Sequence, residues 1–229
     1  MSKFTALGSA VVGMALVFGC SHARQSPEIK EEWLARVPPA QMTEVENSRA
    51  AQREAMNEQN RATAAVTDAK NQLDVAQAER DTAASRVTAA QKERDAAKDT
   101  GEASRLQRAE AMVEQARSVE KAAEAKVKYA EANLKAAQTR ADLAKTQVET
   151  ANAKVKLSEY QALAQNNDTR VRDMSESEFR VDVERSEQEE RKFREQLNKD
   201  EEKVATARQN WNQARQNMQQ ATQPTPPTG

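Results

Sequence analysis

The stretch between Pro39 and Pro224 contains no proline and only one glycine, Gly101. It is rich in Ala, Glu, Gln, Lys and Arg, which have high helix propensities, whereas disordered chains are usually enriched in Pro, Gly and Ser. Aromatic residues make up only 3% of the chain, so little large apolar surface is available for a globular core. The sequence therefore predicts an all-α protein built from long helices.

Alanine recurs every seven residues along two segments, and mostly apolar positions accompany it at the spacing of a coiled-coil seam. The alanines of the first segment are Ala62, Ala69, Ala76, Ala83, Ala90 and Ala97. Those of the second are Ala109, Ala116, Ala123, Ala130, Ala137, Ala144 and Ala151. The two seams predict coiled-coil helices over residues 40–98 and 103–165.

Gly101 lies between the two seams, in a predicted turn over residues 99–102. Glycine adopts the left-handed conformation that ends many helices, and Asp99 or Thr100 can assist the turn. A connection this short favours antiparallel neighbours, and alanine lets their backbones approach to about 8 Å. We therefore expect an antiparallel coiled-coil hairpin whose arms reach roughly 85 to 90 Å at 1.5 Å per residue.

A polar, turn-prone linker is predicted over residues 166–175, followed by a third long helix over 176–222 that Ser175 or Ser177 can cap. The seam of this helix is heavier than the other two. Its apolar members are Phe179, Val183, Phe193, Leu197, Val204, Ala207, Trp211, Ala214, Met218 and Ala221. Residues 223–229 contain three prolines and are expected to form a disordered tail.

The first 19 residues have the features of an export signal. Lys3 precedes an uncharged, mostly apolar run from Phe4 to Phe18. This run of about 15 residues is shorter than the roughly 20 that a transmembrane helix needs. The N-terminus therefore predicts a secreted protein.

The end of this run resembles the lipobox of bacterial lipoprotein precursors, in the residues Val17, Phe18, Gly19 and Cys20. The resemblance implies cleavage before Cys20, the only cysteine, and acylation of its thiol and of its new amino group. Several acyl chains anchor a protein stably, at roughly 0.8 kcal/mol per buried CH₂. Ser21 at the next position implies sorting to the outer membrane of a Gram-negative cell.

A second interpretation of the same segment is an ordinary signal peptide cut after Ala23, because Ser21-His22-Ala23 has the small-x-small pattern of such sites. That cut would remove Cys20 and release a soluble periplasmic protein. In either case residues up to 39 are predicted to form a disordered tether that contains one short helix.

Ser26 is expected to cap the short helix of the tether, with Pro27 at its first position and Pro38-Pro39 at its end. Trp33 on this helix has two interpretations. It fits the lipid headgroup layer, where Trp is enriched, and it fits packing against the end of the helical bundle.

Groups that carry chemistry are scarce. The only histidine is His22 in the tether, no glycine loop is present for phosphate, and the net charge of −1 gives no support to nucleic-acid binding. We expect no enzyme activity, cofactor, metal site or small-molecule substrate. Arg80 and Arg94 occupy seam positions and indicate either a partner site or side chains that snorkel at the edge of the bundle.

The anchor and heptads together resemble helical envelope lipoproteins such as the murein lipoprotein, although this chain ends in Pro-Pro-Thr-Gly and not in a lysine. The hairpin is also similar to that of periplasmic efflux adaptors, without their β-rich domains. We expect a lipid-anchored spacer or assembly scaffold of the cell envelope that self-associates or binds an envelope protein through its coiled coil. The alternative is an accessory binding subunit of an envelope export, efflux or motility complex.

Overall fold

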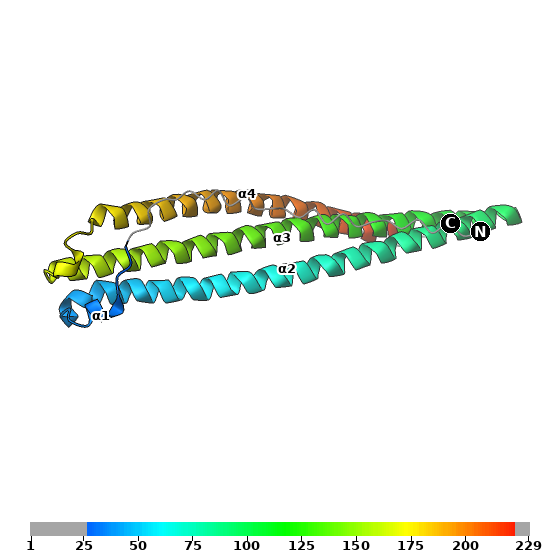
Figure 1. Cartoon of the computed structure of the whole chain (residues 1–229). Coiled ribbons are helices and arrows are strands. Elements are labelled where there is room, and N and C mark those ends of the chain that lie inside the picture. The colour runs from blue at the N-terminus through cyan, green and yellow to red at the C-terminus, as the bar shows by residue number, and fades with distance from the viewer. Residues whose placement is uncertain (1–26, 223–229) are drawn as a thin grey trace, which may run out of the picture.

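A computed structural model describes residues 27–222, and it contains helices and loops but no β-strand in that range (Figure 1). The predicted all-α class is confirmed. Three long helices dominate, preceded by one helical turn and interrupted by one 3₁₀ turn. The elements are α1 (Glu31–Leu34), α2 (Pro39–Thr100), α3 (Ala103–Gln165), η1 (Thr169–Val171) and α4 (Glu176–Thr222).

Helices α2 and α3 form the expected antiparallel hairpin, and the chain reverses at Gly101. This residue has φ of 70°, in the left-handed region, and its N–H donates to the carbonyl of Lys98 at 3.2 Å. Helix α2 continues to Thr100, two residues beyond its predicted end, and the Thr100 hydroxyl donates to the Ala97 carbonyl at 2.7 Å. The turn is therefore shorter than predicted, because one glycine makes the reversal.

The three long helices lie in the order α2, α3, α4, with α3 in the middle (Figure 1). Helix α3 packs against both neighbours, whereas no Cα of α2 lies within 8 Å of a Cα of α4. The arrangement is therefore an open array and not a closed three-helix bundle. The array leaves an open side between α2 and α4.

The seven-residue alanine repeat lies along the contact between α2 and α3. All six repeat alanines of α2 are buried, from Ala62 to Ala97. In α3 four are buried and three are half-buried. The buried ones are Ala109, Ala130, Ala144 and Ala151, and the half-buried ones are Ala116, Ala123 and Ala137. Small side chains at these positions let the two backbones pack closely along their length.

Helices α2 and α4 begin at the same end of the molecule, which we call the base; Gly101 marks the tip (Figure 1). At 1.5 Å per residue the 62 residues of α2 span about 93 Å and the 47 residues of α4 about 70 Å. Helix α4 therefore ends before the tip. The last part of the hairpin consists of α2 and α3 alone.

The predicted start of the short tether helix is wrong. Pro27 is not helical, and α1 begins four residues later, at Glu31, with Lys30 as its N-cap. Pro39, predicted to stop that helix, instead begins α2, where a missing N–H leaves no hydrogen bond unmade. The expected disorder is also wrong for residues 27–38, because α1 and the loop after it pack against the base.

Candidate functional site

The base of the molecule has an apolar cluster to which four segments contribute. Leu34 and Val37 come from the tether, Val45 from α2, Ala162 and Leu163 from α3, and Val171 from η1. Trp33 is half-buried against this cluster. Of the two interpretations of Trp33, the structure has the one in which it packs on the end of the bundle.

Arg49 of α2 fastens the tether to the hairpin. Its guanidinium donates to both carboxylate oxygens of Glu31 in α1, at 2.9 and 2.5 Å, and to Glu159 of α3 at 2.7 Å. The hydrogen bonds with Glu31, and then those with Glu159, raise the pKa of Arg49, and the bonds from Arg49 lower the pKa of Glu31. Three helices thus meet at one side chain, which holds the tether against the rod formed by α2, α3 and α4.

A second polar contact closes the base on the side of η1. Asp168 accepts hydrogen bonds from the backbone N–H of Arg170 at 2.9 Å and from its Nε at 2.8 Å, and these bonds lower the pKa of Asp168 to about 2. The Arg170 guanidinium lies 5.3 Å from the centre of the Trp33 ring, within cation–π range. Asn167, at φ of 55°, provides the reversal before this turn. The linker therefore also holds the tether.

The middle of the α3/α4 contact contains a buried carboxylate, Asp200, which is 1% exposed. It accepts hydrogen bonds from the Thr139 hydroxyl at 2.9 Å, from Gln196 at 3.1 Å and from Lys203 at 2.9 Å. Burial alone would raise the pKa of Asp200, but the hydrogen bonds from Gln196, Lys203 and Thr139 outweigh it and hold the pKa at about 2. Because both carboxylate oxygens accept hydrogen bonds, one of them from α3, Asp200 helps to fix the position of α4.

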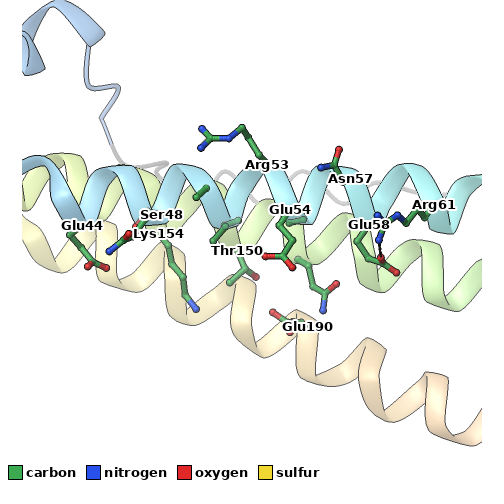
Figure 2. Close-up of a pocket in the computed structure, with 16 residues that line it drawn as sticks. Glu44, Ser48, Arg53, Glu54, Asn57, Glu58, Arg61, Thr150, Lys154 and Glu190 are labelled. Carbon is green, nitrogen blue, oxygen red and sulfur yellow. Dashed lines mark ion pairs between the residues drawn. The ribbon is translucent and has the colours of Figure 1, made fainter.

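The open side between α2 and α4 forms a groove with α3 as its floor. Three hollows lie along it from the base toward the tip, of about 840, 390 and 550 Å³. In the hollow nearest the base, Glu44, Glu54 and Glu58 of α2 lie on the side that faces α4, and Glu190 of α4 faces them (Figure 2). Arg53 points away from α4 (Figure 2). Residues of all three long helices line each of the three hollows.

The groove is polar at the base and more apolar toward the tip. The hollow nearest the end of α4 is lined by Val75, Val119, Trp211 and Met218 among others. Val75, at 56% exposed, is among the exposed large apolar side chains of the described residues. Such a surface suits the docking of another helix better than the binding of a small molecule, because it is long, shallow and open.

The two arginines predicted at seam positions form ion pairs within their own helix. Arg80 pairs with Asp81 at 2.7 Å and Arg94 with Asp95 at 2.6 Å, each with its neighbour on the same helix. Both arginines are half-buried at the edge of the seam. This geometry agrees with side chains that snorkel along the bundle, the second of the two interpretations.

The residues of the predicted anchor lie outside the described range, and the structure does not test them. They are Val17, Phe18, Gly19, Cys20, Ser21 and His22. Within residues 27–222 no group of three or more His, Cys, Asp or Glu side chains is placed to hold a metal ion. In the same range, every helix is too short or too polar to cross a membrane.

Sequence reasoning missed the base, although its residues carried a signal. Arg49 and Glu159 are separated by 110 positions, so only the folded hairpin brings them together. The helical spacing of Trp33, Leu34 and Val37 before a proline pair did indicate an apolar face in the tether.

The chain matches no family of known proteins, no curated protein and no solved structure.

Proposed function

We propose that this protein is a lipid-anchored coiled-coil spacer or assembly scaffold of the bacterial cell envelope, held in the outer membrane through Cys20. The observation that carries the proposal is the way in which the chain enters the rod. Leu34 and Val37 are buried in the base, and Arg49 binds Glu31 and Glu159. A force on an anchor at Cys20 would therefore pass into α2 and α3 and would not merely unravel a loose tether.

The dimensions also fit a spacer. Ten residues, 21–30, separate Cys20 from α1. Even fully extended, ten residues span at most about 35 Å, whereas α2 alone spans about 93 Å. The rod is thus much longer than its connection to the membrane, and the rod sets the distance at which the protein holds whatever binds it.

The anchor is tested with Cys20→Ala in the full chain expressed in a Gram-negative host, with Ser26→Ala as the control outside the lipobox. We expect wild type and Ser26→Ala in the outer-membrane fraction, with a mature N-terminus that mass spectrometry identifies as acylated Cys20. Cys20→Ala should leave that fraction. An unmodified N-terminus at Arg24 in the wild type would show the soluble periplasmic form and refute the anchor.

An accessory binding subunit of an envelope complex is the second candidate, and the groove between α2 and α4 favours it. A photo-crosslinking residue at Glu54, inside the groove, should capture a different envelope protein in intact cells if this candidate is right. The same residue at Arg53, which points away from α4, is the matched control. Equal capture from both positions would mean that the groove is not the binding surface.

A further inference from the structure

One stripe of α2 faces the groove and is not covered by any other helix of the described chain. Its members are spaced alternately three and four residues apart, so they lie on one side of the helix. All of them are exposed except Ala65, which is half-buried. The stripe consists of Glu54, Glu58, Arg61, Ala65, Asp68, Gln72, Val75, Glu79, Thr82 and Arg86.

This stripe is complementary to itself when it is reversed about its midpoint near Lys70. Glu54 then faces Arg86, and Arg61 faces Glu79, so that each charge meets the opposite charge. Asp68 faces Gln72, which can donate a hydrogen bond to it, and the exposed Val75 faces the small Ala65. Thr82 faces Glu58. We propose that two copies of this chain pair antiparallel through the α2 face of the groove, about a two-fold axis near Lys70.

Other alignments of the same stripe bring like charges together. A shift of one heptad in one direction places Glu54 opposite Glu79, and a shift in the other direction places Arg61 opposite Arg86. A parallel pair places every charged residue of the stripe next to its own copy. Like charges across an interface disfavour a pairing and so select the register. The antiparallel alignment about Lys70 avoids these contacts.

The outermost pair of the proposed interface joins Glu54 of one copy to Arg86 of the other. Among the ion pairs of residues 27–222, none includes Glu54 or Arg86. Arg61 has only a loose contact with Glu58 at 3.7 Å, and that contact is exposed. Glu54, Arg86 and Arg61 are therefore available to a second copy without loss of a strong internal bond. Glu79 already pairs with Lys126 of α3 at 2.5 Å and would share its carboxylate between Lys126 and the second copy. An antiparallel interface would contain each pair twice, because the two-fold axis repeats it.

In this antiparallel pair the base of one copy lies at one end of the paired rod, and the base of the other copy lies at the opposite end. If the proposed anchor is correct, a membrane attachment then leaves both ends of the paired rod, and the rod sets the distance between the two attachments. This consequence rests on the proposed function. The pairing itself does not, so it is tested in the full chain with Cys20→Ala, where failure of the anchor cannot affect the result.

The test uses single cysteines in that background and a bifunctional maleimide of about 10 Å reach. Glu54→Cys alone and Arg86→Cys alone should give no dimer, because about 48 Å of helix separates each cysteine from its copy in an antiparallel pair. The two variants co-expressed should give a cross-linked dimer, and Arg53→Cys with Arg86→Cys should give much less. Dimers from either single variant would show a parallel pair and overturn the proposal, as would no dimer from the co-expressed pair.

Charge reversal provides an independent test by sedimentation equilibrium of the same full chain. Glu54→Arg and Arg86→Glu should each weaken self-association by roughly tenfold or more, because each places like charges together at two symmetric sites. The double variant restores opposite charges and should regain most of the affinity. Arg53→Glu, at the rim of the groove with its side chain pointing away from α4, is the control and should have little effect. If the two single variants' losses of association free energy simply added in the double variant, the proposed pairing would be contradicted.

Discussion

The two long interfaces of the molecule differ in chemistry. The α2/α3 contact is a repeat of small side chains, in which buried alanines recur every seven residues. The α3/α4 contact depends on single, large or polar residues: Tyr129 stacks on Trp211 at 5.3 Å, Tyr160 stacks on Phe179 at 5.0 Å, and Asp200 is buried. A repeat packs closely but looks the same after a shift of seven residues, so singular contacts or a turn must set its register.

The largest expected effect is the removal of an aromatic anchor from the α3/α4 contact. Phe179 is fully buried, and Phe179→Ala should lower the free energy of unfolding by about 3–5 kcal/mol. The loss should fall on α4, so limited proteolysis should cut within residues 176–222 before it cuts the hairpin. Val181→Ala, at an exposed position of the same helix, is the control and should change stability by little. Simultaneous cleavage of all three helices would show that the two interfaces are not separable.

Overpacking the alanine seam should have the next largest effect. Ala76 is fully buried against Val127 and Ala130, so a larger side chain at this position has to displace its neighbours or push the helices apart. Ala76→Leu should cost about 1–3 kcal/mol in chemical denaturation followed by circular dichroism. Ala64→Leu, on the exposed side of α2, adds the same atoms without this cost. If Ala76→Leu were as stable as wild type, the seam would not be closely packed.

The parts of this fold that a sequence can predict are those that local signals decide. The bounds of α3 and α4 agree with the predicted ranges because Gly101 and the polar segment before Ser175 interrupt otherwise unbroken helical sequence. The start of α1 does not agree, although Ser26 and Pro27 satisfy a local capping pattern. There, packing of Leu34 and Val37 against distant parts of the chain decides the structure.

The groove could not be predicted from the heptads. A seam tells which side of α3 faces α2, but not the angle around α3 at which α4 packs, and that angle determines whether the bundle is closed. Cross-helix pairs show the same limit. Glu187 and Arg191 lie four residues apart on α4, a spacing that favours an ion pair, yet Glu187 pairs with Lys154 of α3 at 2.9 Å. The way in which α4 packs on α3 determines the partner of Glu187, and no local sequence pattern predicts that packing.

Asp200 makes the α3/α4 contact sensitive to acid in a way that the alanine seam is not. Its folded-state pKa of about 2 lies below the ordinary 3.8, so its contribution to stability is complete above pH 4 and is lost as the pH falls from 3.8 to 2. The urea midpoint should fall over this range. In Asp200→Asn the fall should be shallower, whereas the exposed Asp81→Asn should follow wild type. An unchanged slope in Asp200→Asn would remove Asp200 as the cause.

The smallest expected effect concerns the turn that sets the register of the alanine repeat. A Cβ on Gly101 would meet no atom within 4 Å, so the cost of Gly101→Ala is that of the left-handed conformation alone, about 1 kcal/mol. Gly101→Asn should cost less, because asparagine adopts this conformation more readily than alanine. Denaturation by urea should rank the three proteins in the order Gly, Asn, Ala. Because the seam repeats every seven residues, a strained turn could also shift α3 along α2, and a loss of stability well above this amount in Gly101→Ala would indicate such a shift. Gln52 and Asn152 hydrogen-bond across the two helices at 2.7 Å. Cross-linking of cysteines introduced at these two positions would detect the shift.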